Sequence, residues 1–199
     1  MKIKIRSGLL LPLLILCLVI SDRRIYTLLA LSTAALHELG HILTAKATRI
    51  HLESLSLDLL GARITTKAAL CSYRDEIILC AAGPLTNFIF CALAIIIRNI
   101  YILPASQLWE FFTFFAVSSA ALGILNLLPI ESFDGGRILY CIFAVLCGTA
   151  TSEKILKFLS FVSCFLLWSF SVYLIMRAGT SLSLFAFSVS LFSRLFVLR

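Results

Sequence analysis

The long apolar stretches of this chain constrain its fold more than any other feature. Most of them are long enough to cross about 30 Å of hydrocarbon as helices. With 61% hydrophobic residues and a mean hydropathy of +1.05, the chain is too apolar for a water-soluble domain. The sequence therefore predicts an all-α polytopic membrane protein. The stretches run at roughly 8–20, 25–45, 76–97, 109–130, 135–149, 155–176 and 179–197.

The positions of the 17 Lys and Arg residues favour six crossings over seven. Cytoplasmic segments of membrane proteins carry an excess of these residues. If residues 109–149 form one interrupted crossing, twelve lie inside, four lie outside (positions 23, 24, 98 and 177), and Arg137 lies within the interrupted element. Seven separate crossings would give ten inside and seven outside. We therefore expect about six transmembrane helices, both termini in the cytoplasm, and a re-entrant or interfacial part within 109–149.

Residues 1–199 are predicted to form a single membrane domain, since no linker or low-complexity tract sets off a second one. The stretch 8–20 follows basic residues but offers no small-residue cleavage site, so we interpret it as a retained membrane anchor rather than a signal peptide. The seven cysteines include no Cys-x-x-Cys pair. They are expected to pack as small apolar residues.

Ionisable residues interrupt the predicted helix 25–45, in the run His37-Glu38-Leu39-Gly40-His41. Such residues inside a membrane span usually serve a function. Residues four apart on a helix project from nearly the same face, so His37 and His41 can bind one zinc ion. Glu38 lies about 100° further round the helix, close enough to accept the proton of a metal-bound water that attacks a carbonyl. The pattern is typical of peptide-bond hydrolysis.

A catalytic zinc ion takes a third protein ligand and keeps one position open. The obvious supplier is Asp134, in the run from Asn126 to Gly136. Pro129 removes a backbone donor and the glycines after the aspartate permit tight turning, so we expect the helix to break here. Asp134 would then lie on a loop able to bend back towards the histidines. An ordinary interfacial turn between two helices is the alternative.

The two runs, in this order and in a polytopic chain, resemble the site-2 protease family of intramembrane zinc metalloproteases. That family pairs His-Glu-x-x-His on one transmembrane helix with a later Asn-x-x-Pro-x-x-x-x-Asp-Gly element, which this chain matches over 126–135 without a gap. The resemblance implies that His37, His41 and Asp134 bind Zn²⁺ and that Glu38 is the general base.

The resemblance extends to the run Gly83-Pro84-Leu85-Thr86-Asn87, which looks like the family's Gly-Pro-x-x-Asn element on helix 76–97. It implies that Asn87, like Asn126, lies near the active site and holds substrate backbone or stabilises an oxyanion. A packing hydrogen bond is the alternative for each. The chain departs from many members at Glu131 and Phe133, where they carry a second proline and a leucine.

The size and six-crossing layout look most like the membrane core of the bacterial sporulation factor (fourth-stage FB) group, without PDZ or nucleotide-sensing domains. The resemblance implies a multi-pass protein of the bacterial inner membrane whose partners are the lipid bilayer and a transmembrane substrate, for example a membrane-tethered regulator. No direct contact with nucleic acid is indicated. The sequence leaves the regulator and the oligomeric state open.

Residues 52–66 follow the histidine helix and read as a short membrane-associated β-hairpin. Leu55-Ser56-Leu57-Asp58-Leu59 alternates with period two, and Gly61 can turn the chain. An exposed strand edge could hold an extended substrate as an added strand. A hairpin that merely rests at the interface is the alternative. His51, beside it, is interpreted as an interfacial residue rather than a metal ligand.

The predicted function is cleavage of a peptide bond in or near a transmembrane segment, with the active site nearer the cytoplasmic side. A non-catalytic zinc-binding membrane scaffold is one alternative, although it has no need of Glu38. A metal transporter is the other, although transporters commonly show duplicated halves with binding residues in both. Residues 100–199 contain no second histidine cluster.

Overall fold

The computed structural model describes residues 2–5, 25–48, 52–58, 61–66, 72–102, 104, 106–178 and 182–197. They fall into two compact units, Met1–Asn126 and Leu127–Arg199. The predicted anchor at 8–20 and His51 lie outside the described residues.

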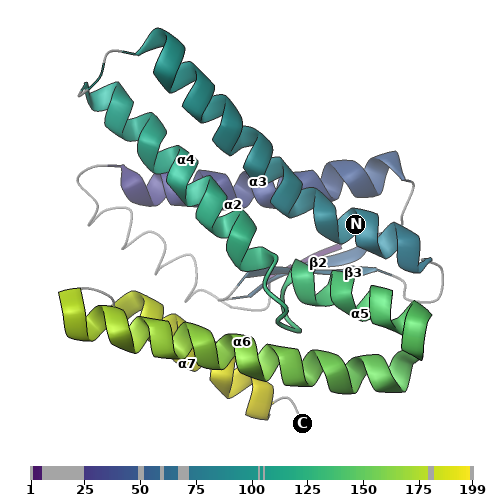
Figure 1. The fold of residues 1–199 in the computed structure, drawn as a ribbon. Helices are drawn as coiled ribbons and strands as arrows, with labels where there is room; N and C mark the ends of the chain where they lie inside the picture. Colours follow the sequence, from purple (N-terminus) through teal and green to yellow (C-terminus); the bar gives the residue numbers. More distant parts are fainter. Residues whose placement is uncertain are drawn as a thin grey trace. The chain divides into compact units, whose positions relative to one another are not determined.

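Three helices build the first unit: α2 (Tyr26–Ala47), α3 (Tyr73–Tyr101) and α4 (Gln107–Asn126). The N-cap of α3 is a serine at position 72, whose hydroxyl accepts a hydrogen bond from the backbone N–H two residues later. Helices α3 and α4 lie side by side, and α2 packs against both (Figure 1). The predicted helices 25–45 and 76–97 are confirmed by α2 and α3.

A glycine lets α2 and α3 approach closely. A Cβ at Gly40 would lie 2.8 Å from the Ala82 carbonyl oxygen and would clash with the Thr86 side chain. The Thr86 hydroxyl donates to that same carbonyl, 2.8 Å away. The close approach brings the buried face of α2 that carries His37 and His41 against α3.

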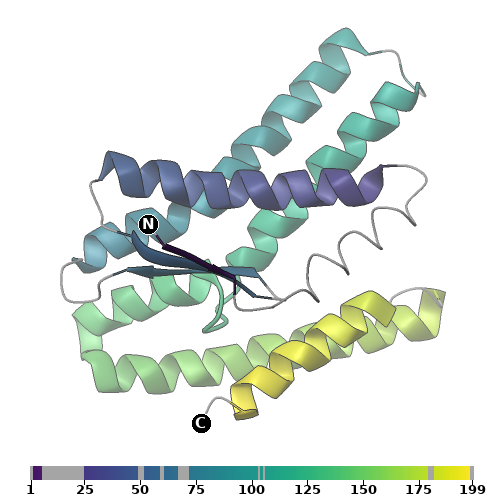
Figure 2. The same ribbon diagram turned by 180° about the vertical axis from the view of Figure 1, so that it is seen from behind.

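The first unit also contains a three-stranded sheet of order β1-β2-β3. Strands β2 (Leu52–Asp58) and β3 (Gly61–Thr66) pair antiparallel over the residues where the sequence predicts a hairpin. Strand β1 (Lys2–Ile5), which the sequence analysis missed, pairs parallel with β2 (Figure 2). Since β2 has a neighbour on each side, β1 and β3 are the edges of this sheet.

The second unit consists of α5 (Asp134–Cys147), α6 (Thr149–Ala178) and α7 (Leu182–Val197), with α6 packed against both others (Figure 2). Gly148 joins α5 to α6 at a φ of 83°, a conformation that glycine adopts without strain. Apolar side chains from the segment before α5, from α6 and from α7 form the core of the unit. These are Ile130, Cys164 and Leu191, with Leu128, Phe133, Leu167, Phe187 and Phe192 packed around them.

Four of the described helices are long and apolar enough to cross a membrane: α2, α3, α4 and residues Thr149–Arg177 of α6. Helix α5 has 14 residues and α7 has 16. At 1.5 Å per residue these are about 21 and 24 Å long, short of the roughly 30 Å of a hydrocarbon core. The region 109–149 therefore combines a helix that is long enough to cross with a shorter one, and the total of six crossings stays a prediction.

The expectation that Asp134 lies on a loop is wrong, because Asp134 is the first residue of α5. The predicted break in the helix is confirmed, but it ends before Asp134 and does not include it. The two glycines that follow are helical and do not turn the chain. A Cβ at Gly135 would clash with the Leu127 carbonyl, and one at Gly136 with the Ile130 carbonyl. Glycine is needed here so that the preceding segment can pack against the first turn of α5.

Candidate metal site

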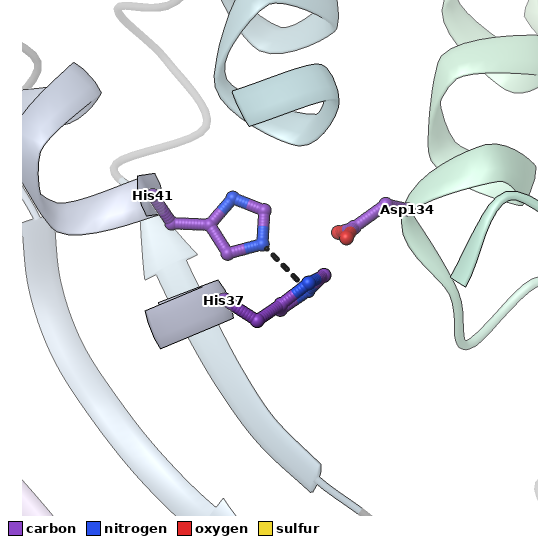
Figure 3. A group of neighbouring side chains, drawn as sticks. All are labelled: His37, His41 and Asp134. Atoms are coloured by element: carbon purple, nitrogen blue, oxygen red, sulfur yellow. Dashed lines mark hydrogen bonds between the residues drawn. The ribbon is translucent and has the colours of Figure 1, made fainter. Parts of the chain in front are cut away.

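The two histidines of α2 face one another through their Nε2 atoms. The Nε2 atoms of His37 and His41 are 3.2 Å apart, and each residue is only 5% exposed (Figure 3). Two nitrogens bound about 2.0–2.1 Å from a tetrahedral zinc ion lie about 3.3–3.4 Å apart. The pair is therefore spaced as two ligands of one zinc ion would be.

A contact with α3 fixes the orientation of the His41 ring. Its Nδ1 lies 2.8 Å from the Leu79 carbonyl oxygen. A carbonyl can only accept a hydrogen bond, so Nδ1 of His41 carries the proton. In the neutral ring the lone pair is then on Nε2, the nitrogen that faces His37.

The His37 ring also meets α3. Its Nδ1 lies 3.2 Å from Nδ2 of Asn87, which is fully buried. Asn87 is therefore close enough to His37, a candidate metal ligand, for one hydrogen bond. Residues of α3 thus contact both histidine rings.

Gly83 lies on α3 between these two contacts and leaves room in front of the two Nε2 atoms. A Cβ at this position would be 2.7 Å from His37 Nε2 and closer still to His41 Nε2. That volume is where an ion bound to both nitrogens would sit. The nitrogen spacing and the missing Cβ together show that the pair fits a zinc ion.

Glu38 follows His37 directly on α2 and is half-buried. Its carboxylate belongs to the same helical turn as the histidine pair. A carboxylate in this position can serve as a base for a water molecule beside the two rings.

Asp134 is half-buried at the N-terminus of α5, where the helix dipole favours a negative charge. It belongs to the second unit and is the residue that the sequence predicts as the third zinc ligand, after His37 and His41. A carboxylate oxygen and two imidazole nitrogens are a ligand set of catalytic zinc sites.

The segment before Asp134 is irregular, but α6 holds it. The Ser160 hydroxyl donates to the Pro129 carbonyl at 3.3 Å and accepts the Glu131 backbone N–H at 2.9 Å. The Phe133 ring stacks on an aromatic ring of α7, with centroids 6.5 Å apart. Glu131, where many site-2 proteases have a proline, supplies an N–H that proline lacks.

Asn126 is the last residue of α4, and its side-chain Nδ2 donates to the Leu122 carbonyl of the same helix, 3.0 Å away. Its side-chain oxygen is the group left to take part in another interaction. No described contact links Asn126 to His37 or His41.

Sequence reasoning included Gly83 in the Gly-Pro-x-x-Asn run but did not predict its place beside the histidine rings, and it missed the Leu79 carbonyl. Their spacing in the sequence could have identified them, because Leu79, Gly83 and Asn87 are four residues apart and share one face of a helix. The same spacing separates His37 and His41 on the helix opposite.

Known proteins resemble this chain in sequence and in structure. Residues 95–170 match the model of Peptidase family M50. A protein of Ralstonia nicotianae named "Putative zinc metalloprotease RSc1411" is 32% identical over 141 residues, which are 69% of this chain and 26% of the relative. The chain therefore spans about a quarter of the length of that curated relative.

A solved structure, the site-2 protease from Methanocaldococcus jannaschii, resembles the chain with a TM-score of 0.64. The alignment covers 98% of this chain and 90% of that one, at 23% sequence identity. Identity at this level supports a common fold.

Proposed function

We propose that the chain belongs to Peptidase family M50, whose model matches residues 95–170, and that it is an intramembrane zinc metalloendopeptidase that hydrolyses a peptide bond in or near a transmembrane segment of a membrane-protein substrate. We also propose that it resembles the sporulation factor (fourth-stage FB) group, because of its size and the six-crossing layout predicted from its sequence.

The observation that carries the proposal is the histidine pair inside a helix long enough to cross a membrane. His37 and His41 offer two Nε2 atoms 3.2 Å apart, with Gly83 leaving space beside them. Ionisable residues are costly in such a helix and persist there for a function. A hydrolytic metal site accounts for both histidines and for Glu38 between them.

His37, His41 and Asp134 are the proposed zinc ligands. When bound, zinc polarises the scissile carbonyl and makes a water molecule acidic enough to give up its proton near neutral pH. Glu38 takes that proton and passes it to the nitrogen of the leaving amine. Glu38 has to be close to the water without being a ligand itself, and its place next to His37 on the same helical turn suits this role.

The substrate is proposed to bind as an extended strand. Strand β3 (Gly61–Thr66) is an edge of the sheet, so its outer backbone groups can pair with a further strand. The side-chain oxygen of Asn126 is proposed to hold the substrate backbone near the cleaved bond. Cross-linking from cysteines introduced along β3 to a bound substrate would test this, and failure at every position would contradict it.

The proposed location is a bacterial inner membrane, with six crossings and both termini in the cytoplasm. This arrangement follows the excess of Lys and Arg in the segments predicted to face inside. It puts the end of α2 that carries His41 nearer the cytoplasm. The substrate could be a membrane-tethered regulator.

Two other functions would use the same ligands. A zinc-binding scaffold or a metal transporter would keep His37, His41 and Asp134 but would not require a base at position 38. The side chain of Glu38 therefore distinguishes the protease from both.

The test is zinc content together with cleavage of a transmembrane peptide by the detergent-purified chain. The variants are Glu38→Gln and Asp134→Asn. Glu110→Gln, which changes an exposed glutamate in the first turn of α4, is the matched control. We expect Glu38→Gln to retain zinc and to lose cleavage by about 10²- to 10⁴-fold, because general base catalysis contributes this much.

Asp134→Asn should bind zinc more weakly than the unaltered chain and Glu110→Gln. Cleavage that survives in Glu38→Gln would contradict the proposed mechanism. Zinc bound equally by all the variants, with no cleavage by any of them, would favour the scaffold.

A further inference from the structure

One face of α3 meets the histidine pair at three consecutive turns. Leu79 contacts His41, Asn87 contacts His37, and Gly83 lies between them beside both Nε2 atoms. The residues of α3 are four apart, as are the two histidines. The contacts run in opposite order along the two helices, so each histidine ring has its own partner on α3.

The two partners differ in chemistry. The Leu79 carbonyl can only accept, and it holds the proton of His41 on Nδ1. The Asn87 amide has a donor and an acceptor. In the structure its Nδ2 faces His37 Nδ1, and its buried Oδ1 has no hydrogen-bond partner in the part of the chain that the structure describes.

A half-turn of the amide exchanges the two atoms and satisfies the buried oxygen. With Oδ1 towards the ring, Asn87 accepts a proton from His37 Nδ1. The lone pair of His37 is then on Nε2, which is the nitrogen that faces His41 and the space beside Gly83. A histidine that binds zinc through one nitrogen usually donates from the other to such an acceptor.

We propose that Asn87 is a positioning residue for the metal: its Oδ1 accepts the Nδ1 proton of His37 and so presents the Nε2 lone pair of that ring to zinc, as the Leu79 carbonyl does for His41. The inference rests on the zinc site of the proposed function. It assigns Asn87 to the metal site rather than to the substrate.

An amide can serve this position with His37 in either tautomer. A ring protonated at Nε2 accepts at Nδ1, for which Asn87 offers Nδ2. A ring protonated at Nδ1 donates there, for which Asn87 offers Oδ1. An aspartate can pair only with the second form and a leucine with neither.

The first test is the zinc affinity of the intact, detergent-purified chain, measured by competition with a chromophoric chelator. We expect Asn87→Leu to weaken zinc binding about 10- to 100-fold, the usual loss when a metal-binding histidine loses its hydrogen-bond acceptor. Asn87→Asp keeps the acceptor and should restore most of the affinity. Ser119→Ala, which removes a fully buried hydroxyl from α4, is the control and should leave the affinity unchanged.

The second test needs no substitution. The chain has three histidines, so selective ¹⁵N labelling of the histidine rings gives a simple NMR spectrum. His37 in the zinc-loaded chain should be protonated at Nδ1 and bound to zinc through Nε2. A His37 bound to zinc through Nδ1 would overturn the proposal, even if Asn87→Asp does not fold.

Equal zinc affinity in Asn87→Leu and the unaltered chain, with cleavage reduced, would also overturn the proposal and would indicate a contact with substrate. Equal weakening in the Leu and Asp variants would do the same, since the acceptor is present in only one of them. A chain that binds zinc but cleaves no transmembrane peptide would contradict the proposed function, whereas the affinities would still decide the role of Asn87.

Discussion

The histidine pair and Asp134 are held by different kinds of structure. His37 and His41 lie on an uninterrupted helix of 22 residues, and α3 contacts the second nitrogen of each ring. Asp134 begins a helix of 14 residues after an irregular segment. That segment is held by one serine of α6 and by apolar packing against α6 and α7.

This difference shows what fixes the positions of the candidate ligand side chains in each region. Helical geometry fixes the spacing of the histidines, and hydrogen bonds fix the direction of their rings. The position of Asp134 depends on a hydrogen-bonded turn and on the burial of Ile130, which is 2% exposed. Small changes of shape near the rings should therefore disrupt metal binding by the histidines. Changes in the packing of the segment before Asp134 should disrupt metal binding by the aspartate.

The largest effect is expected from Gly83→Ala. The added methyl group would occupy the space beside both Nε2 atoms, so zinc content and cleavage should both fall to background. The measurement is metal analysis of the purified protein together with cleavage of a transmembrane peptide.

Gly123→Ala on α4 is the matched control. The nearest atom to its added Cβ would be 3.1 Å away on the Phe88 ring, at the far end of a side chain that can adjust. Zinc content should be normal in this variant. Normal zinc binding by Gly83→Ala would contradict the placement of the ion between the two rings.

An intermediate effect is expected from Ser160→Ala. The substitution removes the hydroxyl that joins the Pro129 carbonyl to the Glu131 N–H. The loss of such a hydrogen bond costs about 1–2 kcal/mol of unfolding free energy. Hydrogen exchange of the Glu131 amide should accelerate, and cleavage should decrease without being abolished.

Ser171→Ala is the control on the same helix. Its hydroxyl pairs with Ser188 of α7 and not with the segment before Asp134. It should leave exchange of the Glu131 amide unchanged. Equal acceleration in both variants would mean that α6 stabilises the segment only in a general way.

The smallest effect is expected from Glu131→Gln. The Glu131 side chain is exposed, whereas its backbone N–H makes the bond to Ser160. The unfolding free energy should change by less than about 0.5 kcal/mol, as for most exposed positions. A large loss of cleavage would show that the carboxylate itself acts in the site.

The parts that could be predicted from the sequence are those set by local geometry. The spacing of His37 and His41 fixes their common face on any helix, and the apolar stretches give the long helices. The break before Asp134 follows from Pro129. The place of Asp134 at the start of α5 did not follow, because Gly135 and Gly136 read as turn residues and are in fact the contact surface for the preceding segment.

The parts of the fold and of the site that could not be predicted depend on contacts between elements distant in sequence. Strand β1 pairs with β2, about fifty residues later, and nothing in four residues of sequence specifies that partner. The bond between Asn87 and His37 also depends on how α3 packs against α2. His37 was identified from its spacing to His41 and Asn87 from a resemblance, but the contact between them was not predicted.

The central proposal is that His37, His41 and Asp134 bind the same zinc ion. The most direct test is zinc X-ray absorption of the Asp134→Cys variant, with the exposed Ser132→Cys as control. We expect one sulfur ligand at about 2.3 Å in Asp134→Cys and none in the control or the unaltered chain. Zinc bound by the histidines with no sulfur ligand in Asp134→Cys would contradict the account.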